Sequence, residues 1–309
     1  MDMTRVAAID CGTNSIRLLI ADPVDGHLRD VHREMRIVRL GQGVDATGEF
    51  APEALTRTRA ALVDYAALCA AHDVDRIRMV ATSAARDVAN RDVFFAMTAE
   101  VLGVSAEVVT GTEEAELSFT GAVDELDPAE APFVVVDLGG GSTEIVLGDD
   151  AVAASFSADI GCVRVTERCL HSDPPTVDEV VAARELVRAR LDEALSAVPV
   201  QRARTWVGVA GTMTTLAALA QDMAAYDAAT IHLSRVRIQR LLQVCEGLIG
   251  MTRAQRAALG PMHAGRADVI GAGAIVVEEL ALALRERAGI QELVVSEHDI
   301  LDGIALSIC

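Results

Sequence analysis

The stretch Asp137-Leu-Gly-Gly-Gly-Ser-Thr-Glu144 lies between two short apolar runs, Phe133-Val-Val-Val136 and Ile145-Val-Leu147. Short runs rich in valine and isoleucine predict buried β-strands. Three consecutive glycines carry no Cβ atoms, so the amides of the connecting turn can approach a ligand closely. Outward amides followed by hydroxyls bind phosphate oxygens, and a carboxylate at each end can hold a hard cation against them. The stretch therefore favours phosphate binding over an ordinary hairpin turn, which would need only one or two glycines.

A second stretch near the N-terminus, Asp10-Cys-Gly-Thr-Asn-Ser15, repeats this pattern. Its Asp, Gly and Ser recur at a constant offset, because 137 − 10, 139 − 12 and 142 − 15 all equal 127. A repeat of this kind, in which each copy leads into alternating helices and strands, predicts two similar α/β segments. Two such hairpins facing each other across a cleft would hold a phosphate chain from both sides.

Composition predicts a folded protein of two domains and limits the partners that it can bind. A length of 309 residues predicts two domains, and a hydrophobic fraction of 51% argues against disorder. The net charge of −19 argues against broad nucleic-acid binding, although loop amides and Mg²⁺ can reverse the potential locally. All 27 basic residues are arginine. The absence of lysine excludes a Walker A loop and any lysine Schiff base.

The sequence contains no signal for export, membrane insertion or a cysteine or histidine metal site. The chain enters its first predicted strand directly, and the apolar stretch 272–284 is short and interrupted by Glu278 and Glu279. Six cysteines are scattered without a CxxC pair, and seven histidines form no HxxxH or HExxH motif. We therefore expect a cytoplasmic protein in which histidine does not bind metal.

Hydrophobic periodicity and capping signals predict the order of the elements. Strands are expected at residues 4–9, 15–21, 27–40, 76–81, 107–110, 133–136, 145–147, 151–160, 205–209 and 292–295. Helices are expected at residues 52–71, 90–101, 111–123, 176–198, 234–248, 268–287 and from 299 to the end. The acidic, proline-containing stretch 124–132 is expected to link the two domains.

Two further side chains qualify as site residues by their position. Arg86 follows the strand at 76–81, and ligands collect at the carboxyl ends of strands in open α/β sheets, although a solvated surface arginine is equally expected there. Glu114 opens the helix at 111–123 on a weakly charged face, where a carboxylate can act as a general base. Its neighbour Glu113 is explained by the helix dipole alone.

A third junction between a strand, glycine and a helix occurs at Gly208-Val-Ala-Gly-Thr212. Amides and hydroxyls at a helix N-terminus bind anions, so Gly211 and Thr212 are candidate phosphate ligands. Close packing of the helix on its strand is the alternative explanation.

Taken in order, these motifs resemble the exopolyphosphatase/guanosine pentaphosphate phosphohydrolase family. The matching segments are Asp10 to Ser15, Thr82-Ser-Ala-Ala-Arg86, Gly111-Thr-Glu-Glu-Ala115, Asp137 to Glu144, Gly208 to Thr212 and Arg266-Ala-Asp268. The resemblance covers essentially the whole chain. It implies the duplicated actin-like, sugar-kinase-like ATPase (ribonuclease H-like) fold, with the active site in the interdomain cleft. Domain I is expected at 1–126, with residues 298–309 packing back on it, and domain II at 127–297, as in short two-domain members without the helical HD-type domain.

The resemblance also implies roles for individual residues. Glu114 would activate a water molecule, with Glu144 as a second catalytic residue, and Mg²⁺ would be held by Asp10, Asp137 and Glu144. The phosphate ligands would be Thr13, Asn14, Ser15, Arg86, Gly139, Gly140, Gly141, Ser142, Gly211, Thr212 and Arg266.

The expected activity is hydrolysis of the terminal phosphoanhydride bond of inorganic polyphosphate, guanosine pentaphosphate or both. The acidic surface, with Glu116 where the family has a basic residue, favours short chains. The alternatives within the same fold are an ATP-dependent small-molecule kinase, a chaperone-type ATPase and an actin-like, nucleotide-gated interaction protein. The expected partners are the substrate and a second copy in a homodimer, without nucleic acid or membrane.

Overall fold

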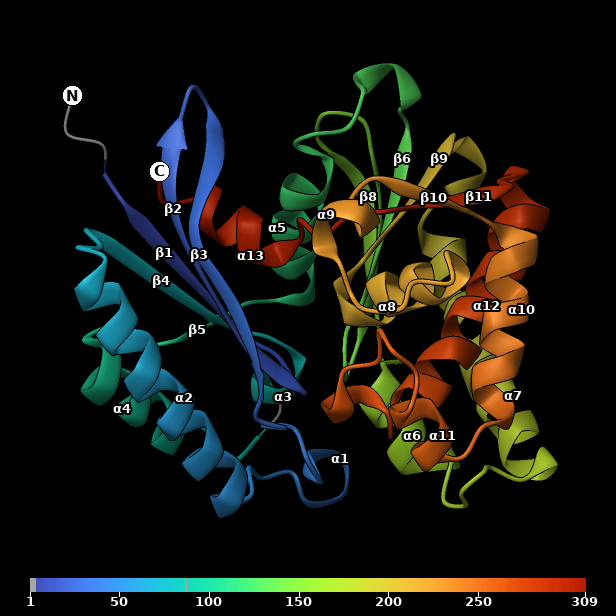
Figure 1. Ribbon diagram of the computed structural model, residues 1–309, viewed down its shortest axis with the longest axis horizontal. Helices are drawn as coiled ribbons and strands as arrows, with labels where there is room; N and C mark the ends of the chain where they lie inside the picture. The colour runs from blue at the N-terminus through green and yellow to red at the C-terminus, as the bar shows by residue number, and fades with distance from the viewer. Residues whose placement is uncertain (1–3, 87) are drawn as a thin grey trace. The chain divides into compact units, whose positions relative to one another are not determined.

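The structure is a computed structural model that describes residues 4–86 and 88–309 (Figure 1). It divides into two compact units. Unit 1 comprises Met1–Asp124 and Asp299–Cys309, and unit 2 comprises Glu125–His298. The chain thus passes between the units after residue 124 and after residue 298, where the sequence predicted residues 126 and 297.

Unit 1 is built on a five-stranded mixed sheet in the order β3-β2-β1-β4-β5. Its strands are β1 (Val6–Cys11), β2 (Ser15–Val24), β3 (His27–Ile37), β4 (Arg76–Ala81) and β5 (Glu107–Val108). β1 pairs with β2 antiparallel and with β4 parallel, which places β1 at the centre. The predicted hairpin and the strand at 76–81 are thereby confirmed.

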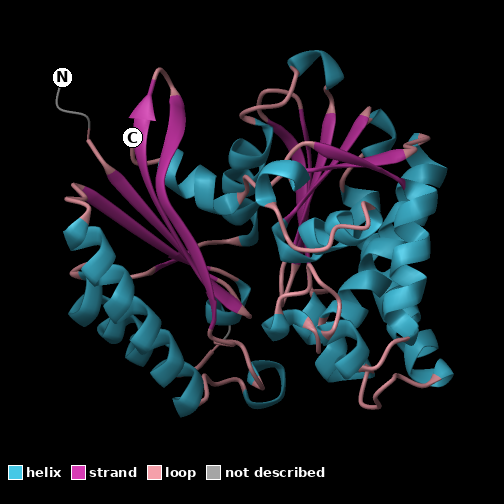
Figure 2. Cartoon of the chain, in the orientation of Figure 1, coloured by secondary structure: helices cyan, strands magenta, loops and turns pink. Residues whose placement is uncertain are grey.

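Helices cover both faces of this sheet (Figure 2). They are α1 (Val44–Thr47), α2 (Pro52–Ala71), α3 (Ser83–Arg86), α4 (Arg91–Leu102), α5 (Gly111–Val123) and α13 (Ile300–Leu306). Successive strand residues point to opposite faces. Accordingly, Ala7 and Ile9 of β1 join the core under α2 and α4. Val6 and Ala8 join a second core with residues of α5 and α13.

The C-terminal helix α13 is fixed in unit 1 by charge and by close packing. Asp299 and Asp302 form its capping box, and each carboxylate also pairs with an arginine of the β2–β3 hairpin. Gly121 of α5 lies so close that a Cβ there would be 1.9 Å from the Asp299 carbonyl oxygen. α13 therefore belongs to unit 1 although it is the last element of the chain.

Unit 2 repeats the topology of unit 1. Its sheet has the order β10-β11-β9-β6-β7-β8. Its third, second, first and fourth strands (β8, β7, β6 and β9) are neighbours in the same order as in unit 1. The sixth strand, β11, takes the place of the fifth strand of unit 1, and the fifth strand, β10, pairs with it at the edge. The strands are β6 (Phe133–Leu138), β7 (Thr143–Gly148), β8 (Val152–Ala158), β9 (Thr205–Val209), β10 (Ser234–Arg237) and β11 (Glu292–Val295). The predicted duplication of an α/β fold is confirmed.

Helices of unit 2 include one correction to the sequence prediction. They are α6 (Cys162–Cys169), α7 (Val177–Ala197), α8 (Ala210–Ala220), α9 (Ala228–Ile231), α10 (Ile238–Gly250), α11 (Arg253–Ala257) and α12 (Ile270–Ala288), with 3₁₀ turns at Pro128–Glu130, Val200–Arg202 and Ala264–Arg266. The predicted helix at 234–248 is wrong at its start, because residues 234–237 pair with β11. Four residues are too few for periodicity to separate strand from helix. Among the described residues, every helix is too short or too polar to cross a membrane.

Candidate functional site

The two predicted phosphate turns have the same backbone geometry in their respective units. The amide of Gly12 donates to the carbonyl of Ser15 over 2.9 Å, and the amide of Gly139 donates to the carbonyl of Ser142 over 3.0 Å. These four residues are related by the 127-residue offset. Each bond closes a tight turn between two antiparallel strands, as the sequence predicted.

In unit 2 the glycine turn is held from behind by the N-terminus of α6. The carbonyl of Gly139 accepts from the Cys162 amide over 3.0 Å, and the carbonyl of Gly140 accepts from the Val163 amide over 2.9 Å. A Cβ at Gly161 would lie 2.3 Å from the Gly140 carbonyl carbon, so the backbones touch. Because α6 binds the carbonyls of Gly139 and Gly140 and the Gly139 amide closes the turn, the amides of Gly140 and Gly141 are the ones left for a ligand.

Arg164 completes this support, and the sequence prediction missed it. Its Nε donates to the carbonyl of Gly141 over 2.8 Å, and its side chain is 19% exposed. It lies 23 residues after the glycine on a helix that the prediction did not include. The sequence signal that could have predicted this helix was Gly161, a glycine directly before its first residue.

Two buried carboxylates stand opposite each other at the glycine turn. Asp137 and Glu144 are register partners on β6 and β7, with residue exposures of 7% and 1%. Glu144 also accepts a hydrogen bond from Ser157 Oγ over 2.7 Å. Like charges directly opposite each other destabilise a sheet, and a bound hard cation with oxygen ligands offsets this. The donor set at this position fits Mg²⁺.

The equivalent pair in unit 1 has a different charge. Asp10 faces Arg17, which occupies the position of Glu144, because 144 − 17 also equals 127. Arg17 donates to Asp10 Oδ2 over 2.8 and 2.9 Å and also pairs with Asp299. Burial raises the pKa of Asp10, and Arg17 opposes that shift. Asp10 Oδ1 is buried with no hydrogen-bond partner among residues 4–86 and 88–309, so it is the oxygen that remains for a ligand.

The other residues of the first turn are partly used by the fold. Thr13 is buried, and its hydroxyl is 3.0 Å from that of Ser83 in α3. The carbonyl of Thr13 accepts from Gly41 and that of Asn14 accepts from Arg39. The side chains of Asn14 and Ser15 are half-buried. In the first turn, Asn14 and Ser15 are therefore better placed than Thr13 to present side-chain groups to a ligand.

Arg86 and Glu114, predicted separately, are in contact. Arg86 Nη1 donates to Glu114 Oε2 over 2.6 Å, and the two side chains are 21% and 9% exposed. Glu113 points elsewhere, pairing with Arg78 over 2.9 Å with 44% of its side chain exposed. The structure thus separates the two adjacent glutamates, as the helical geometry predicted. Gly121, seven residues after Glu114 on the same helical face, contacts Asp299, so part of this weakly charged face packs on the start of α13.

The third junction places Arg266 against the start of α8. Its guanidinium donates to the Gly211 carbonyl over 3.3 Å, and a Cβ at Gly211 would lie 2.1 Å from the guanidinium carbon. Ala210, directly before it, has a φ of 69°, a strained conformation for a residue with a side chain. Cys162 joins this junction to the glycine turn, because Thr212 hydrogen-bonds its thiol while its amide holds Gly139. Burial raises the pKa of the Cys162 thiol to about 11.

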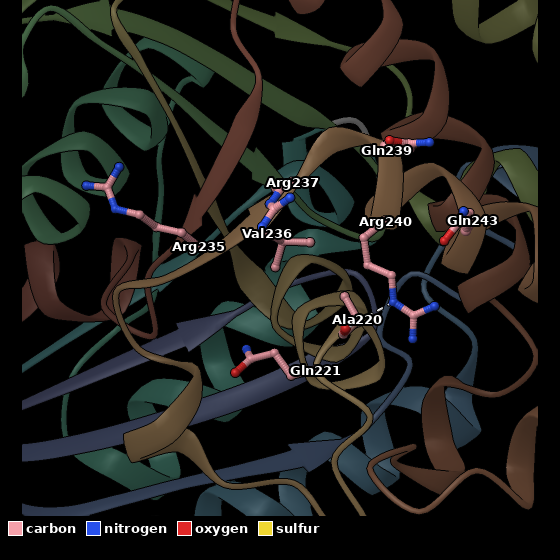
Figure 3. A pocket seen from close by; sticks show the side chains of 8 residues that line it. All are labelled: Ala220, Gln221, Arg235, Val236, Arg237, Gln239, Arg240 and Gln243. Carbon is pink, nitrogen blue, oxygen red and sulfur yellow. Dashed lines mark hydrogen bonds between the residues drawn. The ribbon is translucent and has the colours of Figure 1, made fainter.

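A cavity of about 520 Å³ in unit 2 lies apart from these residues (Figure 3). It is lined by Ala220, Gln221, Arg235, Val236, Arg237, Gln239, Arg240 and Gln243. Acidic partners balance two of its arginines: Arg235 pairs with Glu130 and Glu292, and Arg240 pairs with Asp222. Arg237 pairs in register with the first residue of β11, at the end of the sheet opposite the glycine turn. This cavity is not part of the predicted site.

Comparison with known proteins agrees with the motif order. The profile described as the Ppx/GppA phosphatase family matches residues 19–308. The chain is 74% identical to a Mycobacterium tuberculosis protein named Exopolyphosphatase 2, over all of this chain and 99% of that protein. A solved exopolyphosphatase-like protein superposes with a TM-score of 0.96 at 43% identity, covering 100% of this chain and 98% of the other. A guanosine-5'-triphosphate,3'-diphosphate pyrophosphatase of Photobacterium profundum is 30% identical over 68% of this chain and 42% of that protein.

Proposed function

We propose, from the premise that the chain belongs to the Ppx/GppA phosphatase family, that it is an exopolyphosphatase. It hydrolyses the terminal phosphoanhydride bond of inorganic polyphosphate, guanosine pentaphosphate or both. The observation that carries the proposal is the pair of buried carboxylates, Asp137 and Glu144, opposed at a glycine turn whose carbonyls are tied to α6. A cation held by these carboxylates would lie beside outward amides, as binding of a phosphate chain requires.

The reaction assigns a task to each group. Water attacks the terminal phosphorus, the bridging P–O bond breaks, and Glu114 accepts the proton of the attacking water. Arg86, which contacts Glu114, orients that carboxylate and supplies positive charge for the terminal phosphate. The amides of Gly140 and Gly141 bind phosphate oxygens, and Gly139, whose amide closes the turn, lets the phosphate chain approach because it has no Cβ. Remaining phosphate contacts come from the side chains of Asn14, Ser15 and Ser142 and from the cluster of Gly211, Thr212 and Arg266.

Mg²⁺ is the cofactor we propose, held by Asp137 and Glu144 with Asp10 contributing Oδ1. When bound, it neutralises charge on the phosphate oxygens. The two copies of the turn then have unequal tasks, because Arg17 already compensates Asp10 whereas Asp137 faces a second carboxylate. Cys162 is not assigned as a nucleophile, because burial raises the pKa of its thiol to about 11 and keeps it protonated.

A small-molecule kinase of the same fold is not favoured, because the matching family and the similar full-length relative are described as phosphatases. We propose a cytoplasmic homodimer that uses short chains and binds neither nucleic acid nor membrane, in keeping with the net charge of −19. Sedimentation at several concentrations tests the dimer.

The test of the activity is phosphate release from short polyphosphate, long polyphosphate, guanosine pentaphosphate and ATP, each with Mg²⁺ and with EDTA. Release from polyphosphate or guanosine pentaphosphate that EDTA abolishes supports the proposal. Release from ATP alone, or phosphate transfer to an added small molecule, contradicts it.

A further inference from the structure

Two histidines and a glutamate form a cluster in unit 2 outside the proposed phosphate site. Glu125, His232 and His298 each offer one ligand atom, and these atoms all lie within 4.8 Å of one another. Glu125 Oε2 is 2.9 Å from His232 Nε2, and Glu125 Oε1 is 3.9 Å from His298 Nδ1. The two imidazole ring centres are 4.5 Å apart. The proposed reaction uses none of these side chains.

The backbone holds both histidines in place. His232 directly follows α9, and the next amide, that of Leu233, donates to the Val295 carbonyl over 2.7 Å. His298 follows β11, where its amide donates to Ser296 Oγ over 3.0 Å and that hydroxyl donates to the His298 carbonyl over 2.9 Å. The two rings are therefore positioned by the sheet edge before any ligand binds, which lowers the ordering cost of binding.

We propose that Glu125, His232 and His298 bind one transition-metal dication, with Zn²⁺ as the ion that fits the donor set. Two imidazoles and one carboxylate make up a common three-ligand zinc site, with water as the fourth ligand. Bonds of about 2.0–2.2 Å to a shared ion require only small side-chain movements from the observed separations. Imidazole selects such ions over Mg²⁺, which prefers oxygen ligands. Glu125 is 46% exposed, so an ion can reach the cluster from solvent.

Metal binding changes the tautomer of His232 but not its charge. The Glu297 amide donates to His232 Nδ1 over 3.2 Å, so the neutral ring carries its proton on Nε2, next to Glu125. When Nε2 binds the ion it gives up that proton, and Nδ1 takes one. The Glu297 amide then loses this long hydrogen bond, and Nδ1–H needs an acceptor. One weak contact is exchanged for a metal–nitrogen bond.

The position of the cluster gives the ion a structural consequence. Glu125 and His298 are the first and last residues of unit 2. An ion bound by both joins the two ends of that unit and closes the chain between them. An ion that binds the folded chain and not the unfolded chain stabilises the fold by mass action. Zinc is therefore expected to raise the thermal stability of the protein.

The experiment is titration of the full-length, EDTA-treated protein with Zn²⁺ in the presence of excess Mg²⁺, which fills the oxygen-ligand site at Asp137. Calorimetry should give one Zn²⁺ per chain, and the unfolding midpoint should rise with Zn²⁺. His298→Gln and Glu125→Gln should each weaken binding more than about tenfold and abolish the rise in the midpoint. Co²⁺ should give the visible absorption of a nitrogen-ligated, four- or five-coordinate ion.

The matched control is His171→Gln, which replaces an exposed histidine of the same unit outside the cluster. It should bind Zn²⁺ as the wild type does. Absence of Zn²⁺ binding by the wild type in excess Mg²⁺ overturns the proposal. Equal binding by the wild type and both cluster variants also overturns it. If His298→Gln does not fold, Glu125→Gln decides the question, because it keeps the size of an exposed side chain. None of these results depends on catalytic activity.

Discussion

Replacing Glu114 by glutamine tests the assignment of the general base most directly. The substitution keeps the size and hydrogen-bonding shape of the side chain and removes its ability to accept a proton. General-base catalysis contributes about 10²–10⁴-fold, which corresponds to about 2.7–5.4 kcal/mol of transition-state stabilisation. Turnover of a short polyphosphate should fall by that factor. Substrate affinity should hold or rise, because a negative charge near the phosphate has gone.

The contact with Arg86 adds a stability effect that has to be separated from catalysis. The Arg86–Glu114 distance is 2.6 Å, and the two side chains are 21% and 9% exposed. Removing one partner of a largely buried polar contact costs about 1–3 kcal/mol. Glu114→Gln should therefore also lower the free energy of unfolding, and activity must be measured where the variant is fully folded.

The adjacent Glu113 supplies the matched control. Its side chain is 44% exposed and pairs with Arg78 over 2.9 Å. An exposed ion pair of this kind contributes about 0.2–1 kcal/mol, so Glu113→Gln should change stability slightly and turnover little. Both substitutions remove one negative charge from the same helical turn. A difference in turnover between the two variants therefore reports the position of the carboxylate and not the change in net charge.

The assay is the initial rate of phosphate release together with equilibrium binding of one short polyphosphate, for the wild type and both variants. The reasoning fails if Glu113→Gln is inactive while Glu114→Gln is near wild type. It also fails if Glu114→Gln changes only KM, because a base acts on kcat.

Three further predictions follow from named charges. Asp137→Asn should lower activity by weakening Mg²⁺ binding, so raised Mg²⁺ should partly restore the rate; wild-type activity at limiting Mg²⁺ would refute the ligand role. Turnover should favour short chains, because a long chain extends out of the site onto an acidic surface and is repelled by charges within the ~8 Å screening length. Added salt shortens that length, so the preference should shrink as salt rises. A preference for long chains at low salt contradicts this prediction. Arg5 and Arg29 lower the pKa of Asp22 to about 2, so its stabilising effect, about 1–2 kcal/mol, is present above about pH 4 and lost toward pH 2. Denaturant titrations of Asp22→Asn should therefore show lower stability than wild type at pH 7 and converge near pH 2.

Much of the fold could be predicted from the sequence because each unit is built from locally coded elements. The strand at residues 76–81 and the helix at 52–71 have the predicted bounds, and the helix predicted at 176–198 begins after a capping box formed by Thr176. The short β10 could not be separated from the helix that follows it, because its four residues gain their hydrogen bonds only from β11. A local sequence pattern does not identify a strand whose hydrogen bonds come only from a strand that is distant in the sequence.

Side-chain contacts between segments that are distant in the sequence were harder to predict than the elements themselves. Local spacing could not show that His232 and His298, 66 residues apart, lie beside Glu125, because β10 and β11 bring them together. Arg164 was missed for a similar reason, since its helix touches the glycine turn only after β8 returns the chain. Neither contact corresponds to a periodic pattern of residues in the sequence.

The opposed positions in the two turns, in contrast, can be read from the sequence once the duplication is extended by two residues. The offset that relates Ser15 to Ser142 also relates Arg17 to Glu144. A hairpin closed by the same turn bond in both units must place these residues opposite Asp10 and Asp137. One copy therefore neutralises its aspartate within the protein, while the other opposes two carboxylates. Since buried like charges favour a bound cation, the divergence at this single aligned position is the physical reason for our proposal that the metal is held chiefly by the second copy.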